Sequence, residues 1–208
     1  MNPTPEKTSV MAPFILMLFL YFIVGLFTVI NQQFQVPLKS ALLPHDGNMT
    51  NALVTLLNFS WFLAYPFSEG FATRWVDRLG YRKTSVYSLL IFIVGLGFYE
   101  AAVLLHIYAP SYITIMGNPI FTGFFVFLSG SFVIGMAVTI LQVVTGLYLD
   151  VNPVGKTTPL QRQMIGGTTN SIGMAIGPLV VSYIIFYGIP LHNVQSREFI
   201  WPVICLIA

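Results

Sequence analysis

Uncharged polar side chains recur inside long apolar stretches of this sequence, and their chemistry suits a neutral, hydroxyl-rich ligand. The first apolar stretch contains Asn31, Gln32, Gln33 and Gln35, and Asn31 and Gln35 share one helical face because they are four residues apart. Amides and hydroxyls both donate and accept hydrogen bonds, as a sugar requires. A single amide could equally hold two helices together, but four amides favour a water-filled cavity.

Two further apolar stretches contribute groups of the same kind. Thr139, Gln142 and Thr145 are spaced three residues apart and would form one stripe on a helix. Trp61 and Tyr65 offer flat faces on which a sugar ring stacks, although ordinary packing explains either aromatic on its own. We predict a substrate-binding site made of Asn31, Gln32, Gln33, Gln35, Trp61, Gln142, Thr145 and Asn170.

The composition indicates that most of the chain lies in a membrane. Hydrophobic residues make up 56% of the sequence and charged residues only 8%. Uncharged stretches of about 20 residues are long enough to cross a bilayer as helices. We expect such helices at about 10–36, 51–73, 85–108, 120–149 and 164–187, and an incomplete sixth helix at 199–208. Because that last stretch covers about half a crossing, we expect the chain to be the front part of a longer protein.

Several classes of function are disfavoured by what the sequence lacks. The net charge of +2 comes from few ionisable groups, and there is no basic run of the kind that binds nucleic acid. Cys205 is the single cysteine, and the three histidines are far apart, so no metal site is visible. A membrane enzyme would need a cluster of His or acidic residues. We therefore predict neither an enzyme nor a cofactor.

Lys and Arg residues gather in alternate connections between the expected helices. The N-terminal tail and the connections at 74–83 and 150–162 hold seven of the nine Lys and Arg residues. Cytoplasmic connections of membrane proteins carry this excess, so we expect the N-terminus in the cytoplasm.

The segment DRLGYRK has the highest density of charge, and its order is more specific than topology requires. Asp77 could accept hydrogen bonds from an arginine or a helix N-terminus, and Gly80 permits a tight reversal. Arg82 and Lys83 could meet helix C-termini or acids. We predict that this segment gates a transporter by forming and breaking such contacts. The gating residues would be Asp77, Arg78, Gly80, Arg82 and Lys83.

The same residues resemble the signature between the second and third helices of the major facilitator superfamily. Thr73 stands in place of its leading glycine, and Tyr81 in place of a common arginine. The Gly-Tyr-basic-basic turn, the stretch NQQFQVPLKSAL and the stretch RQMIGGTTNSIG are similar to the fucose:proton symporter family within that superfamily.

This resemblance implies an all-α, polytopic membrane bundle in which residues 1–208 are the N-terminal six-helix half of a twelve-helix fold, with the sixth helix truncated. It also implies a secondary transporter of the bacterial inner membrane that moves a sugar or similar small polar solute by alternating access, with H⁺ or Na⁺ as the coupling ion of a symporter.

Two departures from that family concern its ionisable residues. Gln33 and Gln142 stand where the resemblance implies carboxylates, so neither position can bind a proton at physiological pH. Facilitated diffusion, sodium coupling and a relocated acid all remain open. Glu100 is the candidate for a relocated acid, because we place Glu69 near the cytoplasmic end of the second helix. The alternative for Glu100 is a paired structural acid.

Other functions of the same architecture compete with sugar transport. A drug or metabolite antiporter is disfavoured by the abundance of amides. Gly173, Gly177 and Pro178 fit the start of an antiporter motif, but Val181 occupies the place of its next glycine, so we interpret these residues as a close packing face. A non-transporting six-helix membrane protein is the remaining alternative.

Overall fold

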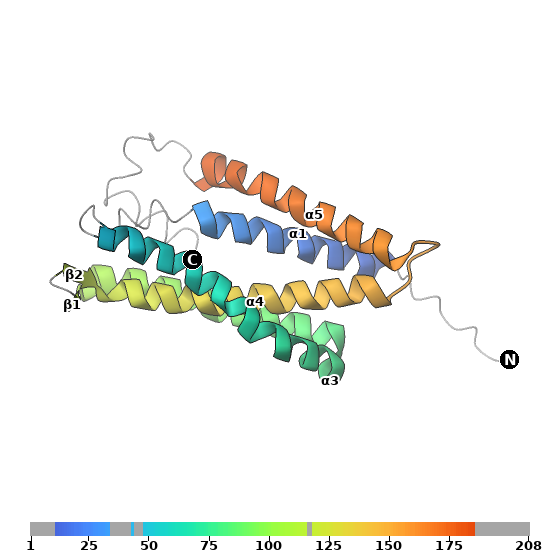
Figure 1. The fold of residues 1–208 in the computed structure, drawn as a ribbon, viewed down its shortest axis with the longest axis horizontal. Coiled ribbons are helices and arrows are strands. Elements are labelled where there is room, and N and C mark those ends of the chain that lie inside the picture. Colours follow the sequence, from blue (N-terminus) through green and yellow to red (C-terminus); the bar gives the residue numbers. More distant parts are fainter. Residues whose placement is uncertain (1–10, 34–42, 44–47, 116–117, 186–208) are drawn as a thin grey trace.

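The computed structural model describes residues 11–33, 43, 48–115 and 118–185 (Figure 1). These residues are almost entirely helical, and four helices are long and apolar enough to cross a membrane, which confirms that part of the prediction. The elements are α1 (Met11–Gln33), α3 (Asn48–Tyr108), β1 (Tyr112–Ile115), β2 (Asn118–Phe121), α4 (Thr122–Val151), α5 (Pro159–Val180) and the π-helix η1 (Val181–Ile185). Gln35 and the sixth helix expected at 199–208 lie outside the described residues.

Helix α3 consists of two helical segments that meet at Gly80. Its 61 residues far exceed one membrane crossing, and Gly80 has the non-helical dihedral angles φ 78° and ψ 166°. Figure 1 shows the chain turning back at this point, so that the two segments run in opposite directions. We expected the two helices to end at 73 and to resume at 85, but both continue to Gly80, so those bounds were wrong. The tight reversal expected at Gly80 is confirmed by its positive φ.

Replacing Gly80 with alanine is expected to destabilise the protein by about 1–3 kcal/mol, because side chains other than that of glycine clash with the backbone at these dihedral angles. The midpoint of thermal unfolding in detergent, followed by tryptophan fluorescence, measures the loss. Gly97→Ala is the control, because Gly97 is helical and an added Cβ there meets no atom within 4 Å. Equal midpoints for the two variants would contradict a special role for Gly80.

Helix α4 is the central element: it packs along α3 and also contacts α1 and α5, which form a pair (Figure 1). Many of its side chains are buried, because it contacts all three other long helices. One apolar cluster near the middle of these helices joins Val24 of α1, Trp61 of α3 and Ile134 of α4. Gly135 brings α3 close to α4, since an added Cβ would lie 2.6 Å from the carbonyl oxygen of Trp61.

Helices α1 and α5 are packed backbone to backbone. An added Cβ at Gly173 would collide with the carbonyl oxygen of Phe22, and one at Gly25 would collide with the carbonyl oxygen of Asn170. Gly177 also faces α1, through Val29. The close packing face predicted on α5 is thereby confirmed.

The basic residues of the described chain lie at one end of the bundle. Arg74, Arg78, Arg82 and Lys83 flank Gly80, and Lys156 and Arg162 flank or follow the turn after α4. The rings of Tyr81 and Tyr148 are 5.3 Å apart, so the Gly80 reversal lies beside the C-terminal end of α4. Phe14 clusters with Leu149, which brings the start of α1 to the same end. This end of the bundle therefore carries the positive charge of the described residues.

Arg162 holds the connection between α4 and α5 together. The residue is 3% exposed. Its guanidinium donates from Nε to the carbonyl oxygen of Leu149 (2.6 Å), from Nη1 to that of Thr157 (2.7 Å) and from Nη2 to that of Asp150 (2.8 Å). Two of these carbonyls belong to the last turn of α4, where acceptors have no partner within the helix. The positive charge of Arg162 therefore caps α4.

The opposite end of the bundle carries an antiparallel hairpin that the sequence patterns did not predict. Strands β1 and β2 pair with Tyr112 opposite Phe121 and Ile113 opposite Ile120. Ile120 and Phe121 are buried in an apolar cluster with Phe124 of α4. The two strands thus lie between α3 and α4 in the chain and cover this end of the apolar cluster.

Candidate functional site

Polar side chains from three helices meet around Tyr65 in the interior of the bundle. The Tyr65 hydroxyl of α3 donates to Oε1 of Gln142 in α4 at 3.5 Å. It also lies beside the Thr28 hydroxyl of α1 and the Trp61 indole. We call Thr28, Trp61, Tyr65 and Gln142 the Tyr65 cluster.

The spacing of residues along α3 and the close contact of Gly135 with Trp61 bring the Tyr65 cluster together. Trp61 and Tyr65 are four residues apart and share one face of α3. Trp61 is 1% exposed, and its Nε1 makes no hydrogen bond that satisfies normal geometry among the described residues. Tyr65 and Gln142 are only partly buried, so they are the members that remain open to a ligand.

A second polar group, the Tyr99 cluster, consists of Asn31, Tyr99 and Ser131. The Tyr99 hydroxyl donates to Oδ1 of Asn31 at 3.3 Å and lies 2.9 Å from the Ser131 hydroxyl. The Tyr99 ring stacks on Phe127 with a centroid distance of 3.9 Å. This cluster also joins α1, α3 and α4. Asn31 and Gln142 therefore belong to different clusters, because Asn31 contacts Tyr99 and Gln142 contacts Tyr65.

Two of the predicted binding residues make structural hydrogen bonds instead of facing an open space. Asn170 donates from Nδ2 to the carbonyl oxygen of Tyr21 at 3.0 Å and so ties α5 to α1. The Thr145 hydroxyl is fully buried and donates to the carbonyl oxygens of Leu141 and Gln142 in its own helix. Both side chains therefore have hydrogen-bond partners within the protein.

Two further predicted binding residues, Gln32 and Gln33, are the last two residues of α1. Gln32 and Gln33 are exposed there, and Gln35 lies outside the described residues. The structure thus joins Trp61 with Gln142 and places Asn31 in the Tyr99 cluster. Of the other predicted residues that the structure describes, Gln32, Gln33, Thr145 and Asn170, none hydrogen-bonds to either tyrosine. The prediction missed Tyr99 and Ser131. Their signal was a tyrosine and a serine inside otherwise apolar spans.

The predicted gating residues surround the reversal in α3 and point outward. Asp77, Arg78, Arg82 and Lys83 are exposed, and none of them forms an ion pair with the described part of the chain. They are therefore available to groups outside it. Glu100, the coupling candidate, is partly buried and likewise has no hydrogen-bond or ion-pair partner in the described ranges.

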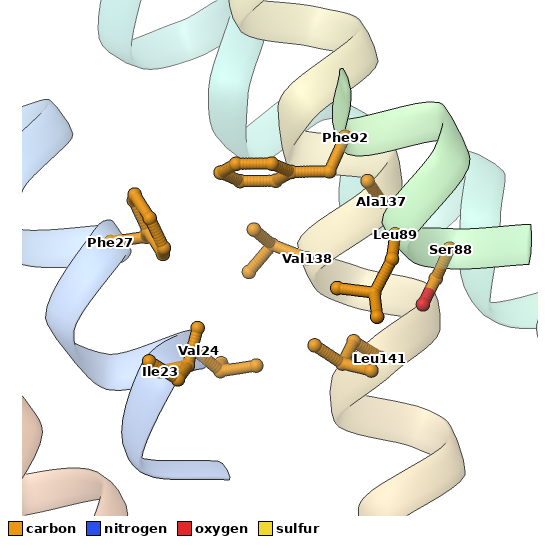
Figure 2. A pocket seen from close by; sticks show the side chains of 9 residues that line it. All are labelled: Ile23, Val24, Phe27, Ser88, Leu89, Phe92, Ala137, Val138 and Leu141. Carbon is orange, nitrogen blue, oxygen red and sulfur yellow. The ribbon is translucent and has the colours of Figure 1, made fainter. Parts of the chain in front are cut away.

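An apolar cavity of about 50 Å³ lies between α1, α3 and α4 (Figure 2). Phe27 and Phe92 flank it, and the polar side chain in its lining is that of Ser88. The Ser88 hydroxyl already donates to the carbonyl oxygen of Ser85 at 2.8 Å. Among its lining side chains, this cavity therefore offers a hydroxylated solute one acceptor, the Ser88 oxygen, and no free donor.

Metal ligands do not gather within the described ranges, where no three His, Cys, Asp or Glu side chains are close enough to hold an ion.

The chain matches no protein-family model, no curated protein and no solved structure.

Proposed function

We propose that this protein is the N-terminal half of a major facilitator-type secondary transporter that moves a sugar or similar small polar solute by alternating access. In this proposal the chain lies in an inner membrane with its N-terminus in the cytoplasm, and a further set of helices completes the solute site. The Gly80 reversal and its charges lie at the inner side, where they gate the transport path.

The observation that carries the proposal is the Tyr65 cluster. It combines a phenol, an amide and a hydroxyl from three helices, and none of these groups is charged. Polar groups within membrane spans are costly unless they have a function or a partner. A hydroxylated neutral solute would satisfy the free hydrogen-bonding capacity of the partly buried Gln142 and Tyr65, and the Trp61 ring beside them would limit the size of the solute.

Replacing Gln142 with leucine is expected to lower the rate of sugar uptake at least about tenfold, because the loss of a hydrogen bond to a polar substrate costs roughly 1.5 kcal/mol or more. Uptake of tritiated neutral monosaccharides into proteoliposomes that contain the full-length protein measures this effect. Tyr65→Phe should act in the same direction, since it removes the hydroxyl and keeps the ring.

Val143→Ala is the matched control, because Val143 is the next residue of α4 and belongs to the apolar contact between α4 and α3. It should leave the affinity for the sugar unchanged. Full uptake by both Gln142→Leu and Tyr65→Phe would rule out the Tyr65 cluster as the solute site. Absence of uptake by the unmodified protein for every sugar tested would reject sugar transport.

A further inference from the structure

The hairpin at the end of the bundle opposite the Gly80 reversal has one buried strand and one exposed strand (Figure 1). Ile120 and Phe121 of β2 are both 2% exposed and pack in the apolar cluster that includes the start of α4. Tyr112 and Ile113 of β1, which pair with them, are 54% and 46% exposed. Strand β2 thus belongs to the core, whereas β1 covers it and presents side chains outward.

The exposed side chains of β1 follow directly on those at the end of α3. Tyr108, the last residue of α3, is 80% exposed, and Ile107 before it is also exposed. The backbone N–H of Thr122, at the start of α4, donates to the carbonyl oxygen of Ser111 at 2.9 Å and fixes β1 against α4. The exposed apolar and aromatic side chains of this region, which we call the hairpin surface, are those of Ile107, Tyr108, Tyr112 and Ile113.

The chemistry of the hairpin surface fits the boundary between lipid and water. No Lys, Arg, Asp or Glu occurs between Glu100 and Asp150, so the connection from α3 to α4 contains none of these residues. The hydroxyls of Tyr108 and Tyr112 make no hydrogen bond with the described part of the chain. Grouped exposed apolar side chains mark a contact with another molecule or a membrane. Tyrosine, which has an apolar ring and a polar hydroxyl, is enriched at membrane–water interfaces.

The lengths of two helices place the hairpin at the level of the lipid headgroups. Lys83 is the last cation after the Gly80 reversal, and the helix from Lys83 to Tyr108 is about 37 Å long. On α4 the helix from Thr122 to Asp150, which lies at the basic end, is about 42 Å long. A bilayer has about 30 Å of hydrocarbon and about 40–45 Å with both headgroup layers. When the charged residues lie in one headgroup layer, the hairpin therefore lies in the other.

We propose that the hairpin surface binds the lipid headgroup layer on the side of the membrane opposite the basic end, and so holds α3 and α4 at a fixed depth. Ile107 and Ile113 contact the upper parts of the acyl chains, and the hydroxyls of Tyr108 and Tyr112 donate to phosphate and ester oxygens of the lipids. Because this surface has no Lys or Arg, zwitterionic phosphatidylcholine is sufficient for binding. This inference depends on the membrane-spanning helices and not on the transport of a solute.

A nitroxide spin label at Thr114 tests the position of the hairpin in the full-length protein in phosphatidylcholine vesicles. Thr114 is an exposed residue of β1 next to Ile113. Collision of the label with oxygen, relative to collision with a water-soluble nickel complex, reports how deep the label lies. Labels at Val94, which is exposed halfway along the second segment of α3, and at Lys156, which is exposed at the basic end, provide the values for hydrocarbon and water. Each label is attached to an introduced cysteine after Cys205 and any other native cysteine have been replaced.

We expect the label at Thr114 to lie within about 7 Å of the hydrocarbon boundary, so that its collision ratio falls between those at Val94 and Lys156. A ratio equal to that at Lys156 would place the hairpin in bulk water and overturn the proposal. Little collision with either reagent would mean that another part of the protein covers the surface, and would overturn it as well. A change of the ratio when phosphatidylglycerol is added would reject the assignment to neutral lipid.

Replacing Tyr108 and Tyr112 together with serine tests whether these side chains hold the hairpin in place. The label at Thr114 should move toward water by about 5 Å, which is most of the width of a headgroup layer. Tyr183→Ser is the matched control, because Tyr183 is 70% exposed in η1, which follows α5 at the same end of the bundle (Figure 1). This control should leave the depth of the label unchanged. An unchanged depth in the double variant, or an equal shift in the control, would show that Tyr108 and Tyr112 do not anchor the hairpin.

Discussion

Arg162→Ala is expected to lower the free energy of unfolding by roughly 3 kcal/mol, because three carbonyl oxygens lose a charged donor at once. The carbonyl oxygens of Leu149 and Asp150 are in the final turn of α4, where no backbone N–H of that helix replaces the lost donor. The removal of a positive charge from the negative end of the helix adds to the loss. The midpoint of thermal unfolding in detergent should fall by several degrees.

Arg162→Lys distinguishes the hydrogen-bond geometry from the charge. The lysine ammonium keeps the charge but cannot reproduce the planar group that reaches Leu149, Thr157 and Asp150 together. The unfolding midpoint of Arg162→Lys should therefore lie between those of the unmodified protein and Arg162→Ala. Lys156→Ala is the control, since Lys156 is exposed in the same connection. A midpoint for Arg162→Ala equal to that of Lys156→Ala would show that Arg162 does not cap α4.

Gly173→Val is expected to destabilise the protein by about 2–3 kcal/mol, because the new side chain occupies the space of the Phe22 carbonyl and pushes α1 away from α5. The neighbouring atoms are backbone and cannot move aside by a change of rotamer. As the helices separate, the hydrogen bond from Asn170 to the carbonyl oxygen of Tyr21 should also be lost. Thermal unfolding in detergent measures the sum of these effects.

Gly167→Val provides a matched control on the same helix. An added Cβ at Gly167 meets no atom within 4 Å, so this variant has the same change of composition and helix propensity without the collision. Its unfolding midpoint should stay close to that of the unmodified protein. Equal losses in the two variants would mean that helix propensity, and not the contact with α1, determines the effect.

The long helices could be predicted from the sequence because the bilayer sets their length, but their ends could not. Charge marks where a span leaves the hydrocarbon, and a helix continues beyond that point if its backbone remains satisfied. Residues 74–79 therefore stay helical in spite of Arg74 and Asp77. Similarly, α5 begins at Pro159, before the apolar window at 164, because Thr158 and Gln161 form a capping box.

The candidate site was predictable in its residue types and less so in its members. Gln142 and Asn31 were expected as polar groups in apolar spans, and both contact tyrosines. The hydrogen bonds of Thr145 depend on its side-chain rotamer, since its hydroxyl reaches back to its own helix. The bond from Asn170 depends on a close approach between α1 and α5 that requires glycines on both helices. The distance between two helices cannot be predicted from the spacing of residues along either helix alone.

The single-residue break at Gly80 has a consequence for how the chain enters a bilayer during synthesis. The two segments of α3 leave no spare residues between them, so the first cannot complete its crossing independently while the second is still being made. We therefore expect both to insert together as a preformed pair. Arg78, Arg82 and Lys83 at the bend would then remain on the ribosomal side of the membrane. Insertion in the opposite orientation would require these cations to cross the hydrocarbon, which is costly.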